Sequence, residues 1–170
     1  MMIRPILKYG ASLLHAPAQP VAGLTSAIER LIDDMIETMY AAPGVGLAAP
    51  QVGEPLRMFV VDVSAGRDPK GLVVMINPEF VERSGMQLEE EGCLSVPGFN
   101  ATVVRPSHVV IRGLDRDGAE HQHEGNGLLA RAFQHEMDHL DGMLFVEHLR
   151  GVKREMIIRK IKKLTRAGKW

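Results

Sequence analysis

The residues with the clearest chemical potential are two histidines and a glutamate near the C-terminal end of the chain. His135 and His139 stand four residues apart, so on a helix both imidazoles project from one face and can bind one metal ion. Glu136 lies between them, beside the metal but not needed as a ligand. That is the position of a general base that activates water. An exposed helix face that matches this pattern by chance is the alternative.

Two imidazoles leave a tetrahedral site incomplete, so the metal interpretation requires a third protein ligand. The position six residues after His139 is Phe145, which excludes a third histidine there. Glu155 would make the chain a small zinc peptidase, and Cys93, the only cysteine, is the other candidate. A structural metal module is a further alternative, although such a site normally has four protein ligands and would not explain Glu136.

Length and composition predict a single domain over residues 1–170. The chain is 45% apolar and 24% charged, which is ordinary for a globular protein with one sizeable core. One cysteine excludes an internal disulfide and fits a reducing compartment. The first residues contain no long apolar run of the kind found in signal or membrane segments. We therefore expect a cytoplasmic protein without a membrane partner.

The charge of the chain is unevenly distributed. Residues 146–170 contain nine Lys or Arg and two Glu, a balance of +7, so residues 1–145 carry −8 of the net charge of −1. A basic segment on an acidic body predicts a polyanionic neighbour. An exposed, lysine-rich terminal helix with no such partner is the alternative.

Two helices must flank the chemical motifs. Ser26 and Glu29 form a potential capping box, and an apolar stripe from Ile28 to Met39 recurs with helical spacing up to a stop at Pro43. A basic helix is expected over residues 147–164. The helix that carries the two metal-site histidines should begin near residues 125–126 and end at about 142.

Short strands are expected between these helices. Their ranges are 57–63, 72–76, 79–81, 86–91, 102–105 and 108–112, with turns at 68–71, 77–78 and 115–118. His121 and His123 are interpreted as surface residues. The fold class is therefore predicted as α+β, with antiparallel strands packed around a central metal-binding helix and a C-terminal helix.

The stretch 44–51, GVGLAAPQ, is rich in small residues. It follows a helix and lacks the third glycine of a dinucleotide-binding fingerprint. Its two glycines and two alanines predict instead that another backbone approaches closely here. The stretch ends at Gln51, a polar amide.

Three segments in a fixed order resemble the signature motifs of the peptide deformylase family. They are GVGLAAPQ at 44–51, EGCLS at 91–95 and QHEMDHLDG at 134–142. This family removes the formyl group from the N-terminal methionine of new bacterial and organellar proteins. The compact length and basic C-terminal helix resemble the class typical of Gram-negative bacteria.

The resemblance implies a metal site and its chemistry. It makes Cys93, His135 and His139 the ligands, with water as the fourth, and Glu136 the acid and base. The implied metal is Fe²⁺, one per chain, with Zn²⁺, Ni²⁺ or Co²⁺ able to substitute. A metal is useful because a formamide carbon is a poor electrophile and hydroxide is scarce at neutral pH.

The resemblance also implies how the substrate is held. It assigns the developing oxyanion to Gln51 and the backbone N–H of Leu94, and backbone hydrogen bonds with the peptide to Val45 and Gly46. Many relatives have Arg where this chain has Asn100, a few residues after the cysteine motif. This difference leaves the metal ligands unchanged but affects the contacts with the peptide on that side of the site.

The helix face shared with the histidines includes Leu128, Arg131 and Ala132. Leu128 and Ala132 are predicted to wall an apolar pocket for methionine, whose side chain is flexible and polarizable. The expected partners are N-formyl-methionyl nascent peptides and, through the basic C-terminal helix, the ribosome. We expect no DNA partner.

Overall fold

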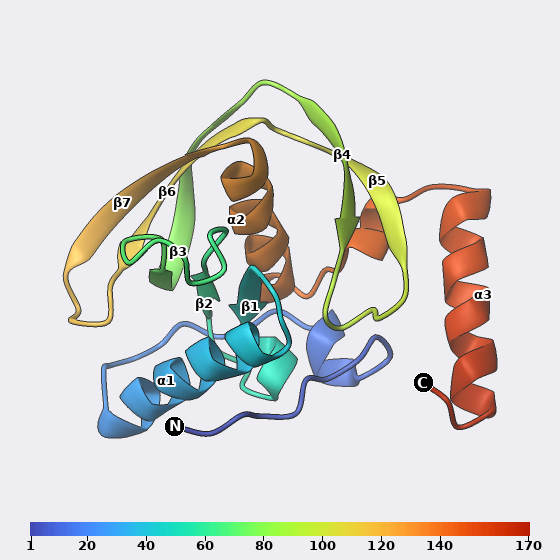
Figure 1. The fold of residues 1–170 in the computed structure, drawn as a ribbon, viewed down its shortest axis with the longest axis horizontal. Helices are drawn as coiled ribbons and strands as arrows, with labels where there is room; N and C mark the ends of the chain where they lie inside the picture. The colour runs from blue at the N-terminus through green and yellow to red at the C-terminus, as the bar shows by residue number, and fades with distance from the viewer.

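The computed structural model describes all 170 residues and shows an α+β fold with one helix, α2, at its centre (Figure 1). Antiparallel strands arch over this helix and a C-terminal helix stands to one side, so the predicted fold class is confirmed. The elements are α1 (Ser26–Ala41), β1 (Gly46–Ala48), β2 (Met58–Val61), β3 (Val73–Ser84), β4 (Gln87–Gly92), β5 (Asn100–Arg105), β6 (His108–Leu114), β7 (Glu120–Asn126), α2 (Gly127–Leu140) and α3 (Val152–Arg166), with short 3₁₀ helices η1 (Ser12–His15), η2 (Ala49–Val52) and η3 (Phe145–His148).

Strand β2 of the main sheet is buried on both faces. This sheet has the order β1-β2-β3-β6-β7, whereas β4 and β5 form a separate two-stranded sheet. Side chains alternate between the two faces of a strand. Met58 and Val60 therefore pack in the cluster that contains α1, and Phe59 and Val61 pack in the cluster that contains α2. The sheet holds α2 firmly against β1, which positions the helix that carries the histidines.

Helix α1 has the predicted apolar stripe, and Leu31, Ile32, Met35 and Met39 of this stripe form its buried face. The predicted cap at Ser26 is wrong. Thr25 is the N-cap: its backbone is extended, with ψ 167°, and its side chain accepts a hydrogen bond from the Ile28 N–H at 3.3 Å. Ser26 already has a place in the first helical turn, so its hydroxyl is not the cap.

The turn predicted at residues 77–78 is also wrong, because β3 continues through Asn77 and Pro78. The pairing of β3 with β6 shifts register at this point, and Asn77 has a positive φ of 51°. The strand thus absorbs two turn-forming residues as a bulge. The Asn77 side chain accepts the Val21 N–H at 2.8 Å and donates to the Val21 carbonyl at 3.0 Å. These two bonds hold the N-terminal arm, the segment before α1, against the sheet.

His121 and His123 lie on β7 and are partly exposed and partly buried, so only one side of each is at the surface. His121 Nδ1 and His123 Nε2 are 2.9 Å apart, and the His123 ring lies 6.3 Å from that of Phe133 on α2. Burial lowers the pKa of His123, and the neighbouring His121 lowers it further. The hairpin from β6 turns this face of β7 toward α2, which sequence alternation alone did not show.

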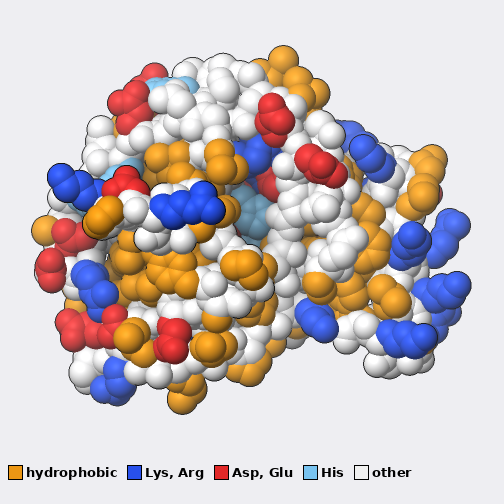
Figure 2. Space-filling view, in the orientation of Figure 1, with side chains coloured by type: hydrophobic (Ala, Val, Ile, Leu, Met, Phe, Trp, Pro, Cys, Tyr) orange, Lys and Arg blue, Asp and Glu red, His pale blue; other side chains and the backbone are white.

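The C-terminal helix begins later than predicted, at Val152, after the 3₁₀ helix η3 and a positive φ of 63° at Gly151. Ile157 and Ile161 are its buried contacts with the body. Figure 2 shows Lys and Arg side chains gathered along the outer side of this helix. No helix of the protein has both the length and the apolar character needed to cross a membrane.

Candidate active site

Three potential metal ligands meet at α2. The thiol of Cys93 and one ring nitrogen each of His135 and His139 all lie within 4.8 Å of one another. Cys93 directly follows β4, and its Sγ lies 3.3 Å from His139 Nε2 on α2. The Ser95 N–H points at the same sulfur at 3.4 Å. Glu155 is exposed on α3 and is not part of this group, which argues against a peptidase built on that residue.

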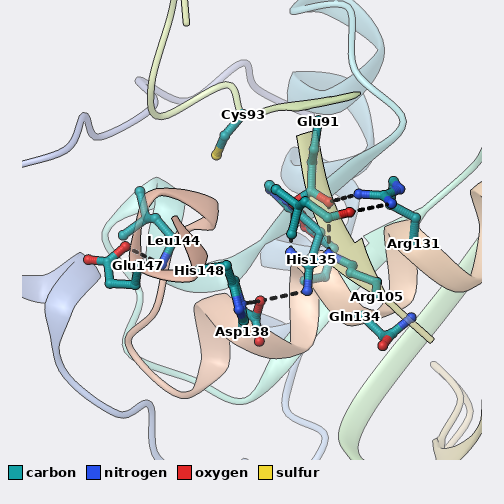
Figure 3. Close-up of polar contacts among 12 residues, drawn as sticks. Glu91, Cys93, Arg105, Arg131, Gln134, His135, Asp138, Leu144, Glu147 and His148 are labelled. Carbon is teal, nitrogen blue, oxygen red and sulfur yellow. Dashed lines mark hydrogen bonds and ion pairs between the residues drawn. The ribbon is translucent and has the colours of Figure 1, made fainter. Parts of the chain in front are cut away.

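The sequence did not point to Glu91 as a functional residue, yet its carboxylate links His135 to two buried arginines (Figure 3). Its buried carboxylate lies 2.6 Å from His135 Nδ1, accepts two hydrogen bonds from Arg105 at 2.8 and 2.6 Å, and accepts one from Arg131 at 2.8 Å. A contact at Nδ1 leaves His135 Nε2 to face Cys93. The available signal was that Glu91 directly precedes the Gly-Cys pair on a predicted strand.

The charges around Glu91 determine its ionisation. Burial alone would raise the pKa of this carboxyl, but the hydrogen bonds from Arg105 and His135 outweigh burial and hold the pKa far below its usual range. Glu91 is therefore a carboxylate at neutral pH. It compensates two guanidinium groups that are themselves only 4–5% exposed.

Glu136 is the other buried carboxyl, and it is 2% exposed. Its Oε1 lies 4.0 Å from His135 Nε2, and its Oε2 has no hydrogen-bond partner. Burial raises the pKa of Glu136 to about 7, although the nearby His135 lowers it. An unpartnered buried carboxyl beside three metal-ligand atoms is suited to exchanging a proton with a bound molecule.

Two of the small residues, Gly44 and Gly46, leave room for side chains of the site. A Cβ on Gly46 would lie 3.0 Å from the Glu136 carboxyl carbon, and a Cβ on Gly44 would lie 2.8 Å from the Leu94 side chain. Within the chain, the groups nearest to these two glycines are therefore side chains of the site. The approach of a second backbone stays a prediction. Gly46 leaves the space in which Glu136 sits.

Gln51 has a fixed orientation at the edge of the site. Its Oε1 accepts the Ala48 N–H at 2.9 Å, and its Nε2 donates to Ser95 Oγ at 3.0 Å. The same Nε2 lies 3.8 Å from Cys93 Sγ, so its second N–H is directed at the metal-ligand group. The Leu94 N–H has no acceptor within the chain. The Leu94 N–H is therefore free to donate, whereas the second N–H of Gln51 has only a long contact with a sulfur.

Strand β1 leaves one edge free, because it pairs only with β2. The Val45 carbonyl accepts the Asp62 N–H on the β2 side at 2.8 Å. Backbone groups alternate in direction along an antiparallel strand. The N–H and C=O of Gly46 therefore point to the free edge. The Val45 carbonyl is used within the sheet, so the backbone bond expected from it to the peptide is not available, and Val45, which is 38% exposed, lines the cavity instead.

A cavity of about 400 Å³ joins these groups. Ala132 lies in its wall and is 6% exposed, whereas Leu128 is 56% exposed and forms part of the mouth. Arg131 also lines the cavity, but its guanidinium is committed to Glu91. Nine of the ten predicted site residues line this cavity: Val45, Gly46, Gln51, Cys93, Leu94, Leu128, Ala132, His135 and Glu136. The tenth, His139, belongs to the group of metal-ligand atoms beside it.

The chain matches the family model described as polypeptide deformylase over residues 3–155. The peptide deformylase of Acidobacterium capsulatum is 48% identical over 170 residues, which is 100% of both chains. The crystal structure of a peptide deformylase from Legionella pneumophila matches with a TM-score of 0.91 at 46% identity, over 98% of this chain and 97% of that one. The peptide deformylase of Ehrlichia chaffeensis in complex with actinonin matches with a TM-score of 0.88 at 37% identity, over 96% and 98% of the two chains.

Proposed function

This chain belongs to the polypeptide deformylase family and is a metal-dependent hydrolase that removes the formyl group from N-terminal formyl-methionine, and we propose how its own residues divide that work. The observation that carries the proposal is the group formed by three metal-ligand atoms and the unpartnered carboxyl of Glu136 at one cavity.

We assign metal binding to Cys93, His135 and His139. The donor set fits a divalent transition metal, because a thiolate and two imidazoles are ligands that such ions prefer. The contact of Glu91 with His135 is the outer partner that ligating imidazoles usually have. The family resemblance favours Fe²⁺, with Zn²⁺, Ni²⁺ or Co²⁺ able to replace it. A metal held here would acidify a water molecule and polarise the formyl oxygen.

Replacing Cys93 with serine should remove most of the bound metal, because a hydroxyl is not anionic at neutral pH and is a harder donor than a thiolate. Formate release from formyl-Met-Ala should be measured anaerobically, with metal content determined on the same sample. Wild-type protein should release formate in proportion to its metal content, and the variant should lose both. Unchanged metal content in the variant would rule out Cys93 as a ligand.

Glu136 moves the protons of the reaction in this proposal. As a carboxylate it takes a proton from the attacking water, and as a carboxylic acid it gives that proton to the amine that departs with methionine. Glu136 is placed for both transfers, because its carboxyl lies beside the three metal-ligand atoms and has no hydrogen-bond partner of its own on Oε2.

Gln51 and Leu94 stabilise the negative charge that develops on the formyl oxygen. Two fixed N–H donors at that oxygen lower the barrier most when the charge is greatest. Gly46 pairs with the peptide backbone as an added strand, which gives affinity that is independent of later side chains. Leu128 and Ala132 contact the methionine side chain.

Replacing Gln51 with alanine should lower kcat by about a hundred- to a thousandfold and change KM little, because the lost donor acts mainly on the transition state. Steady-state kinetics with formyl-Met-Ala measures both constants. Ser95→Ala is the control, because it removes the hydroxyl that accepts from Gln51 but keeps the amide. Its effect on kcat should be much smaller. A change confined to KM in Gln51→Ala would place the oxyanion elsewhere.

The enzyme acts in the cytoplasm on chains leaving the ribosome in this proposal, and the basic face of α3 contacts ribosomal RNA. Arg159, Lys163 and Arg166 are exposed on this helix, whose buried side holds Ile157 and Ile161. Removing α3 would expose the core beneath it, so charge neutralisation is a sharper test than truncation.

Changing Arg159, Lys163 and Arg166 together to glutamine should weaken ribosome binding and reduce its dependence on salt, because each lost phosphate contact removes counterion release. Turnover of formyl-Met-Ala should be unaffected. The control neutralises three exposed cations on the body: Arg30, Arg67 and Lys70. Equal losses of ribosome affinity in both triple variants, or binding that ignores salt, would exclude a specific role for α3.

A further inference from the structure

The polar network around Glu91 does not end at Arg105. The third nitrogen of the Arg105 guanidinium, Nη1, donates to Asp138 Oδ2 at 2.9 Å. His148 Nε2 donates to the same oxygen at 2.7 Å (Figure 3). Exposure rises outward along this path, from 4% for Arg105 to 19% for Asp138 and 31% for His148. A continuous set of charge-assisted hydrogen bonds therefore joins a partly exposed histidine to His135.

The path connects four separate elements of the fold. His148 lies on η3, Asp138 on α2, Arg105 on β5 and Glu91 on β4. Asp138 is also the residue immediately before His139, so its side chain is anchored on the same helical turn as the metal-site imidazoles. The His148 bond holds the Asp138 carboxylate in the orientation that faces Arg105, and Arg105 in turn holds Glu91 against His135.

We propose that His148 is a positioning residue for the metal site, acting through Asp138, Arg105 and Glu91 on the orientation of His135. It contacts neither substrate nor metal. This inference rests on the proposed assignment of Cys93, His135 and His139 as metal ligands. Coupling through a connected set of polar contacts changes site affinity by a modest factor, smaller than the loss of a direct partner of the imidazole.

The chain provides a matched control for a purely structural role. His15 lies on η1, and its side chain is 31% exposed, like that of His148. Its Nδ1 lies 3.7 Å from Glu147, which is on η3 with His148. Its Nε2 accepts the Gly10 N–H, so it fastens the N-terminal arm but has no bond into the Glu91 network. A substitution that merely loosens η3 should have the same effect at either histidine.

The test measures release of zinc from the zinc-loaded enzyme to a chelator, together with kcat and KM for formyl-Met-Ala. In His148→Asn the amide is too short to reach Asp138, and zinc release should be about three- to tenfold faster, with kcat lowered and KM unchanged. In His148→Gln the amide can replace Nε2, and both values should return close to those of the wild type. His15→Asn should behave as the wild type.

Two results would overturn the proposal: a wild-type rate of zinc release in His148→Asn, or equal acceleration in His15→Asn. The double variant with Asp138→Ala adds a further test, because this change removes the oxygen that Arg105 and His148 share, and His148→Asn should then have no additional effect. Additive effects would show that His148 acts by another route. Failure of the wild-type protein to hold zinc would instead overturn the ligand assignment, and this inference with it.

Discussion

Replacing Glu136 with alanine should lower formate release by about a hundred- to ten-thousandfold, the range expected when a general acid and base is lost. The metal should stay bound, because the ligand group does not include this carboxyl. Glu136→Gln is the matched variant, since it keeps the side-chain volume next to Gly46 but cannot accept the proton. Both variants should be inactive with wild-type metal content. Activity within a few-fold of the wild type in either would refute the proton-transfer role.

Glu136→Gln should also change how the stability of the metal-free protein depends on pH. Burial raises the pKa of Glu136 from an ordinary 4.5 to about 7. The folded state therefore binds this proton more tightly than the unfolded state does, and the wild-type protein should lose stability as pH rises between these values. Glu136→Gln should lack this loss. Denaturant unfolding at pH 5 and pH 8 measures the difference, and identical pH dependence in the two proteins would contradict the buried, unpartnered state of the carboxyl.

Replacing Glu91 with alanine should destabilise the protein by about 3–5 kcal/mol, the usual cost of removing one partner from a buried ion pair. Arg105 would keep Asp138, and Arg131 would keep its hydrogen bonds to Gln87 and the Val103 carbonyl, but both guanidinium groups would lose their nearest negative charge. Urea unfolding of the metal-free protein measures this cost directly.

The same variant should also bind metal about 10- to 100-fold more weakly, because His135 loses the partner that orients its ring. Glu89→Ala is the matched control: it removes an exposed glutamate from the same strand and should change stability by less than about 0.5 kcal/mol. Comparable losses in the two variants would mean that the charge of Glu91 contributes no more than a surface carboxylate.

The sequence by itself determined the features that depend on residues close together in the chain. A spacing of four places His135 and His139 on one face of α2, and the apolar stripe of α1 follows the same helical geometry. The three motif segments also identified the family, because their residues and order carry that information without any knowledge of how they pack.

Local patterns were least reliable where a residue's surroundings come from distant strands. Asn77 has the composition of a turn, yet β6 continues to pair with its strand and accommodates it as a bulge. His123 has the polarity of a surface residue, yet the β6–β7 hairpin turns it toward Phe133. In both cases pairing between strands outweighed the local preference.

Only the tertiary structure decided what holds the metal-site helix in place. Glu91, Arg105 and Arg131 come from β4, β5 and α2, and nothing in their local sequence indicates that they are buried together. Burial is the reason that they must meet, because an isolated charge in the interior costs several kcal/mol whereas a compensated group is tolerated. Which carboxylate compensates which guanidinium depends on the strands and helix being brought together, and the chain acquires that information only when it folds.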